Sequence, residues 1–121
     1  MPENHPVLEE VPMKSLSSSN LEKILEEEGA KIIFLWGYNC PNCDVAKSSL
    51  YEELETVRAL PVQWYHCNVY EDFDVATRFG LHGIPVFLLY QGPRSRGKVT
   101  SYPGFDSFLD IIKTRLLEIP A

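Results

Sequence analysis

Apolar runs along the chain predict a series of short strands. Residues 31–37 (KIIFLWG) form a continuous apolar run, which is typical of a strand buried on both faces of a sheet. The β-branched and aromatic residues of 62–69 and 86–90 predict two further strands, and 99–102 predict a fourth. Residues 13–16 predict a short strand at the edge of the sheet.

Apolar residues at helical spacing predict four helices between and after these strands. The first follows a capping-box pattern that begins at Ser19, and it is expected to end at Gly29. The others are predicted for about residues 43–58, for 72–80 and from Asp106 onward.

The order of these elements indicates an α/β fold. Strands joined through helices are parallel, whereas the last two strands form an antiparallel hairpin. We therefore expect a central mixed sheet of four to five strands with helices on both faces. A single domain is expected over 13–121, after a flexible tail at 1–12 that carries three prolines among acidic residues.

The composition narrows the environment and the partners. A formal net charge of −6 disfavours binding to nucleic acid or to anionic lipid. The amino terminus has no cationic segment followed by an apolar run, and the longest apolar run is too short to cross a bilayer. We therefore expect a cytoplasmic monomer without membrane contact.

Three cysteines, Cys40, Cys43 and Cys67, are too few for a structural disulfide framework. A structural zinc site needs four cysteine or histidine ligands, and the three histidines of this chain are scattered. We therefore expect neither a metal nor another cofactor. Cys67 lies on a predicted central strand, which favours a buried and unreactive thiol.

The segment Cys40-Pro41-Asn42-Cys43 stands where a buried strand ends and a helix begins. Unpaired amides and the positive end of the helix dipole favour an anion there. In CxxC motifs such cysteines have thiol pKa values of roughly 3.5–7.5, below the ordinary 8.5. Cys40 would attack a substrate disulfide, and Cys43 would then attack Cys40 and release the reduced product. The alternative is a chance CxxC in a turn, which the strand–helix setting disfavours.

Gly83-Ile84-Pro85 stands directly before a predicted buried strand. Because proline donates no hydrogen bond to a sheet, its place there needs a reason. We predict a cis Ile84–Pro85 bond that presents the Ile84 N–H and C=O groups beside the cysteines, where an extended substrate would pair with them. The alternative is an ordinary trans proline.

Together these motifs resemble the thioredoxin family over about residues 13–118. Residues 36–43 (WGYNCPNC) resemble its W-A-x-x-C-x-x-C segment, 68–85 resemble the stretch that leads to its cis-proline, and 102–104 resemble its late glycine segment. The resemblance implies a thioredoxin-like fold and thiol–disulfide exchange with protein substrates through the two motif cysteines. It also implies that substrates contact the following residues: Trp36, Tyr38, Asn39, Pro41, Asn42, Gly83, Ile84, Pro85 and Gly104.

Three departures from the family pattern bear on the chemistry. Phe34 replaces a buried aspartate that manages the proton of the resolving cysteine, and His66 stands where a lysine is usual. His66 is a candidate for proton transfer at Cys43, because imidazole titrates near neutral pH, and a merely packed strand histidine is the alternative. The third departure is the Pro-Asn dipeptide with Asn39 before the motif, which resembles glutaredoxins and bacterial disulfide oxidases. It predicts a reduction potential above that of thioredoxin, about −200 to −250 mV.

Two functions stay open at this point. The first is a thiol–disulfide oxidoreductase that exchanges with protein thiols or disulfides and with an unidentified reductant or oxidant. The second is a protein-binding module with incidental redox activity, which the changes at Phe34 and Asn39 favour. Glutathione-dependent reduction fits less well, because glutaredoxins carry T-V-P at the cis-proline, where this chain has Gly83-Ile84-Pro85.

Overall fold

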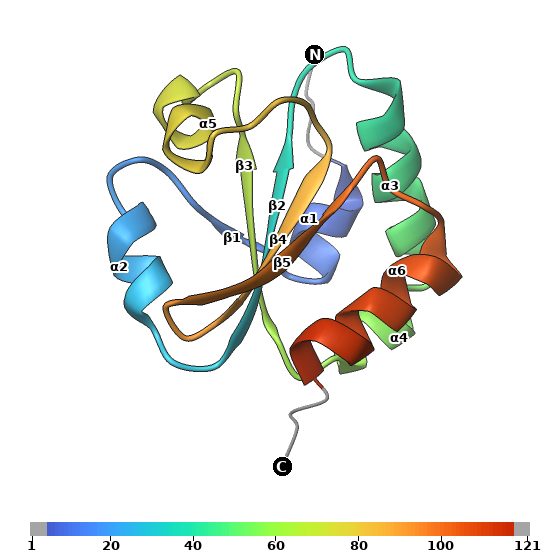
Figure 1. Ribbon diagram of the computed structural model, residues 1–121. Coiled ribbons are helices and arrows are strands. Elements are labelled where there is room, and N and C mark those ends of the chain that lie inside the picture. The colour runs from blue at the N-terminus through green and yellow to red at the C-terminus, as the bar shows by residue number, and fades with distance from the viewer. Residues whose placement is uncertain (1–4, 118–121) are drawn as a thin grey trace.

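The computed structural model describes residues 5–117 and shows in them one five-stranded sheet with the order β1-β3-β2-β4-β5 (Figure 1). Strand β3 pairs in parallel with both β1 and β2, whereas β4 pairs antiparallel with both β2 and β5. The predicted mixed sheet is therefore confirmed. The strands are β1 (Lys14–Ser15), β2 (Ala30–Trp36), β3 (Gln63–Asn68), β4 (Val86–Gln91) and β5 (Arg94–Thr100).

Helices cover both faces of the sheet, as predicted (Figure 1). Helices α2 and α5 pack on one face, and α1, α3, α4 and α6 pack on the other. None of the helices within residues 5–117 has the length and apolar character needed to cross a membrane. Their bounds are α1 (Pro6–Glu10), α2 (Leu21–Glu26), α3 (Pro41–Glu52), α4 (Leu54–Ala59), α5 (Phe73–Phe79) and α6 (Phe105–Ile112), and the π-helical turn η1 (Lys113–Leu117) continues α6.

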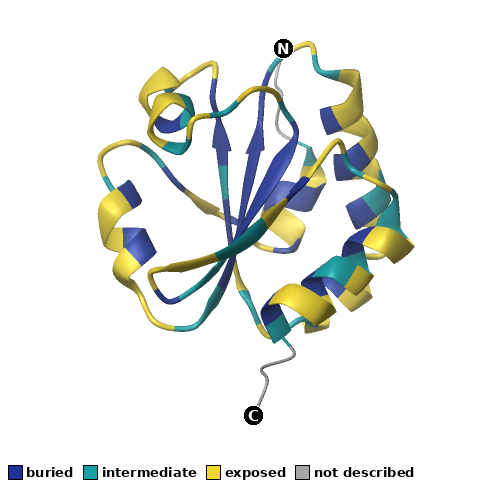
Figure 2. Cartoon of the chain, viewed as in Figure 1, coloured by how far each residue is buried: buried dark blue, intermediate teal, exposed yellow. Residues whose placement is uncertain are grey.

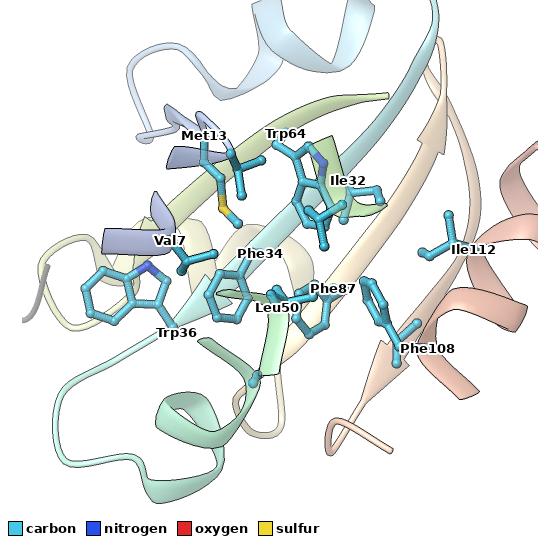
Figure 3. Packing of buried hydrophobic residues seen from close by; sticks show 14 of the residues in the cluster. Val7, Met13, Ile32, Phe34, Trp36, Leu50, Trp64, Phe87, Phe108 and Ile112 are labelled. Carbon is cyan, nitrogen blue, oxygen red and sulfur yellow. The ribbon is translucent and has the colours of Figure 1, made fainter. Parts of the chain in front are cut away.

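The central strand β2 explains the continuous apolar run. Its side chains alternate between the two faces, so that Phe34 and Trp36 enter one apolar cluster whereas Ile33 and Leu35 enter the other. Both clusters are closed to solvent by helices, and the buried strands lie between exposed outer helix surfaces (Figure 2). Figure 3 shows the larger cluster, in which Phe34 stacks on Phe87 with ring centroids 4.7 Å apart.

The amino-terminal segment corrects the prediction of a flexible tail at 1–12. Pro6 begins helix α1, and the Val7 N–H donates to Nδ1 of His5, which caps the helix. Val7 and Val11 are buried in the larger cluster. The prolines suggested an irregular tail, but proline at the first helical position is compatible with the start of a helix. The folded domain therefore includes residues 5–12, while residues 1–4 and 118–121 of the predicted boundaries lie outside the described range.

Other element boundaries also differ from the prediction. The helix predicted for 43–58 is divided at Glu53 into α3 and α4, and α2 ends three residues before Gly29. Strand β5 spans Arg94–Thr100, whereas the sequence predicted this strand at 99–102. Charged side chains on an edge strand discourage pairing with another chain, so they are compatible with β structure at this position.

Candidate functional site

The loop between β2 and α3 positions the CxxC motif at one end of the sheet (Figure 1). Asn39 turns the chain with a φ of 52°, a left-handed conformation that asparagine adopts more readily than most residues. Cys40 is the residue that caps α3, and Pro41 occupies the first helical position, where no hydrogen bond is lost. The predicted strand–motif–helix arrangement is therefore present.

Cys40 and Cys43 form a disulfide, with Cα atoms 5.2 Å apart. The N–H of Cys43 donates to Sγ of Cys40 over 3.1 Å, so an amide of the first helical turn points at this sulfur. Cys43 is 0% exposed, whereas Cys40 is partly exposed. An incoming thiol or disulfide therefore reaches Cys40 and not Cys43.

The loop before β4 lies against the motif. The Ile84–Pro85 peptide bond is cis, as predicted. The carbonyl oxygen of Ile84 lies 3.9 Å from Sγ of Cys40, although the two residues are 44 positions apart in the chain. The structure thus brings the two sequence motifs together at one point.

An open groove of about 340 Å³ surrounds the accessible sulfur. Most of the predicted contact residues next to the motif line this groove, and Tyr70 is an unexpected member. Gly83 and Pro85 line a neighbouring hollow that shares Ile84 with the groove. The residues that line the groove are Asn39, Cys40, Pro41, Asn42, Tyr70 and Ile84.

Two predicted contact residues occupy other positions. Trp36 is 2% exposed within the larger cluster, so the prediction that it contacts substrates directly is wrong (Figure 3). It supports the site from the core instead, because its position at the end of β2 places the ring in the same cluster as residues of α1 and α3. Gly104 precedes α6 with a φ of 99° and is not among the groove residues, so its contact with substrate stays a prediction.

His66 is held by the buried tryptophan. Nε1 of Trp36 donates to Nδ1 of His66 over 3.2 Å, which requires an unprotonated Nδ1. Burial and the positive charge of Lys47 lower the pKa of His66, and both effects favour the same neutral ring. Within the described residues no hydrogen bond joins His66 to either motif cysteine, so its role in proton transfer stays a prediction.

The sequence analysis missed Lys47, a buried cation beneath the motif. Its Nζ lies 3.4 Å from the centroid of the Trp36 ring, and the residue is 2% exposed. Lys47 follows Cys43 by four residues, and this spacing puts both residues on the buried face of α3. That spacing was the available signal, but a lysine is rarely expected on a buried face.

Two aromatic residues of the β3–α5 segment also escaped the sequence analysis. Tyr70 and Phe73 follow β3, whose carboxyl end lies beside that of the parallel strand β2. Tyr38, which was predicted to contact substrates, stacks on Tyr70 with ring centroids 6.3 Å apart. The common edge of parallel strands was the signal that could have placed these residues near the cysteines.

The third cysteine takes no part in the disulfide. Cys67 is buried on β3, as predicted, and burial together with Asp72 and Glu71 raises its pKa to about 11. Phe34 is fully buried as well, so an apolar ring occupies the position where the thioredoxin pattern has a carboxylate.

The architecture and the placement of the disulfide define a thioredoxin-like fold. The chain is similar to a mutant thioredoxin from Halobacterium salinarum, with a TM-score of 0.75 and 14% identity over 91% of this chain and 96% of that one. It is also similar to oxidized mitochondrial thioredoxin 3 from Saccharomyces cerevisiae, with a TM-score of 0.72 and 18% identity over 87% and 97%. A third similar chain has a TM-score of 0.72 and 17% identity over 85% of this chain and 95% of that one. Its structure comes from work on the thiol resolving mechanism in yeast mitochondrial 1-Cys peroxiredoxin via glutathione/thioredoxin systems.

Comparison of sequences adds nothing to this result, because no protein-family model and no curated protein matches the chain significantly. At the identities found among solved structures, the similarity establishes the fold.

Proposed function

We propose that this chain is a thiol–disulfide oxidoreductase that acts on protein disulfides or dithiols through Cys40 and Cys43. The position of the Cys40 sulfur supports the proposal most strongly. It accepts a hydrogen bond from the Cys43 amide at the start of α3 and also faces the open groove. Helix-terminal amides and the positive end of the dipole stabilise an anion, so the thiolate of reduced Cys40 would be the attacking group.

The different exposure of the two sulfurs supports different roles for them. In the reducing direction, the Cys40 thiolate attacks one sulfur of a substrate disulfide, and the other substrate sulfur leaves as a thiolate. The buried Cys43 then loses its proton and attacks Cys40 in the mixed disulfide. This step releases the second substrate thiolate and forms the disulfide seen in the structure. The same steps in reverse oxidise a substrate dithiol.

Cys43 needs a proton acceptor in the second step, and Phe34 supplies none. We propose that His66 assists, because a neutral imidazole can accept a proton near neutral pH. Its Nδ1 is occupied by Trp36 Nε1, so Nε2 carries the ring proton in this state and proton uptake requires the Trp36 contact to open. His66→Ala should then slow the exchange reaction and alter its pH profile, whereas an unchanged rate and profile would exclude the role.

We further propose that the pair is less reducing than thioredoxin, with a potential of about −200 to −250 mV. The Pro-Asn dipeptide and the apolar Phe34 support this value. Equilibration of the protein with mixtures of reduced and oxidised glutathione measures the potential. A value at or below about −270 mV, which is typical of thioredoxin, would refute it. A buried free thiol and the low cysteine count also support a reducing, cytoplasmic environment.

Reduction of insulin tests the oxidoreductase against the alternative of a binding module. Wild-type protein with a dithiol donor should precipitate the released insulin chain, whereas Cys40→Ser should not. Cys43→Ser should accumulate a mixed disulfide through Cys40, because the resolving thiol is absent. If the wild type shows no turnover with any dithiol donor at any pH tested, the binding module becomes the better explanation.

A further inference from the structure

Three aromatic residues form a continuous surface cluster that extends away from the active-site groove. This aromatic cluster consists of Tyr38, Tyr70 and Phe73. The rings of Tyr38 and Tyr70 stack with centroids 6.3 Å apart, and Phe73 meets Tyr70 edge-on with centroids 5.9 Å apart. Tyr70 is 48% exposed and Phe73 is 63% exposed. Grouped exposed rings beside a reactive centre are typical of an interaction surface, whereas packing alone would bury them.

Tyr70 joins the aromatic cluster to the reactive sulfur. It lines the groove together with Cys40 and Ile84. A Cβ atom at Gly37 would lie 2.7 Å from the Tyr70 ring and 2.7 Å from Cδ1 of Ile84, so the close approach of these side chains requires glycine there. The thioredoxin pattern has alanine at this position. Gly37 thus departs from that pattern, and the missing Cβ leaves room for the Tyr70 ring.

Acidic residues flank the aromatic cluster, one of them in direct contact with it. Glu71 and Asp74 are exposed on either side of Phe73 in sequence, and Glu71 also accepts a hydrogen bond from the Tyr38 hydroxyl. An arginine or lysine side chain over such rings gains from the negative ring face and from the nearby carboxylates. Its apolar stem covers the ring at the same time. The surface therefore favours basic residues over acidic ones.

We propose that the aromatic cluster docks an extended substrate segment that carries arginine or lysine within about four residues of the reactive cysteine. The spacing supports this reach, because Tyr70 lines the groove around Cys40 and the three ring centroids span at most about 12 Å, the length of three or four extended residues. The proposal rests on the proposed function and adds a substrate class to it. The protein thus selects basic disulfide-bearing segments through Tyr70 and Phe73, while Cys40 performs the exchange.

Synthetic peptides with one cysteine test the proposal. Each peptide carries the cysteine as a mixed disulfide with 2-nitro-5-thiobenzoate, and arginine, alanine or glutamate stands at one of the four flanking positions on each side. The reduced protein attacks the peptide disulfide, and the released coloured thiolate reports the rate. At the best position arginine should exceed alanine by about twofold to fivefold, and glutamate should be slowest. Equal rates for arginine and glutamate at every position would overturn the proposal.

Variants locate the preference on the aromatic cluster. Phe73→Ala should bring the ratio of the arginine rate to the alanine rate close to one. Tyr51→Ala is the matched control, because Tyr51 is 42% exposed on α3 and packs against His5 outside the cluster. It should keep the wild-type ratio, and a ratio lost equally in both variants would overturn the proposal. If Phe73→Ala misfolds, the paired change Glu71→Gln and Asp74→Asn must lower the ratio instead.

The small disulfide 5,5′-dithiobis(2-nitrobenzoate) separates this proposal from the proposed function. Reaction with the small disulfide and with all peptides, but without preference for arginine, would overturn the docking surface alone. Absence of turnover with every peptide would overturn the oxidoreductase and the docking surface together. Loss of the preference at high salt supports the carboxylate contribution, because exposed charges are screened.

Discussion

Replacing Val7 with alanine tests whether the amino-terminal helix belongs to the folded domain. Val7 is 0% exposed and lies in the same apolar cluster as Phe34 and Trp36 (Figure 3). The substitution removes two carbons from this site, and each buried carbon of this kind contributes about 0.8 kcal/mol. The cavity left by incomplete relaxation adds to the loss. We therefore expect the free energy of unfolding to fall by about 2 to 3 kcal/mol.

Val45→Ala provides a matched control. Val45 lies on α3 and is 56% exposed, so the same chemical change removes little buried surface. Its effect should stay within about 0.5 kcal/mol, and the higher helix propensity of alanine offsets part of any loss. The comparison holds the substitution constant and changes only burial.

Urea unfolding of the oxidised proteins, followed by tryptophan fluorescence and circular dichroism, measures both effects. The disulfide stays formed throughout, so that the unfolded states of the variants remain comparable. A Val7→Ala loss no larger than that of Val45→Ala would refute the packing of α1. It would instead support the prediction, made from the prolines, that the amino-terminal segment is a flexible tail.

Further predictions concern the buried titrating groups. In the reduced, folded protein a short pulse of iodoacetamide at pH 8 should label Cys40 and spare Cys67, because burial and nearby carboxylates raise the Cys67 pKa to about 11. Mass spectrometry identifies the labelled cysteine. Rapid labelling of Cys67 before unfolding would contradict this prediction. Burial and Lys47 lower the pKa of His66 in the folded protein. On acidification from pH 7, His66 therefore takes up its proton first in the unfolded state, near pH 6.5, and the free energy of unfolding should fall. Lys47→Met should raise the His66 pKa in an NMR titration and reduce the acid loss, and an unchanged His66 pKa would exclude the influence of Lys47.

The strongest patterns in the sequence predicted the central strand β2 and the two motifs of the candidate site. Strand β2 is apolar at almost every position because both of its faces are buried, and none of the helices between residues 5 and 117 has such a run. The CxxC motif and Ile84-Pro85 are short, but each has a restricted place in the fold, at a helix start and before a strand. The contact between these two motifs was predictable, because the end of β2 and the start of the antiparallel strand β4 lie at the same end of the sheet.

Features that depend on packing between distant segments were not predictable from local patterns. Helix α1 gains its stability from burial of Val7 and Leu8 rather than from its five-residue length, and a short helix leaves little periodicity in a sequence. The place of Tyr70 depends on glycine at position 37, which lies in another loop. Propensity and periodicity describe neighbours along the chain, so they cannot report such contacts.

Two buried side chains, Phe34 and Lys47, bear on the proposed reduction potential. Phe34 stands where the thioredoxin pattern has a carboxylate, which would oppose a thiolate nearby. Lys47 follows Cys43 by one turn on the buried face of α3, with Nζ 3.4 Å from the Trp36 ring centroid. In the reduced protein, a cation one turn along the helix and the lack of a carboxylate at position 34 would each favour an ionised thiol over a protonated one. Stabilising a thiolate stabilises the reduced dithiol relative to the disulfide, which raises the reduction potential. The buried cation Lys47 therefore adds a physical reason for the less reducing pair that we propose from the Pro-Asn dipeptide and Phe34.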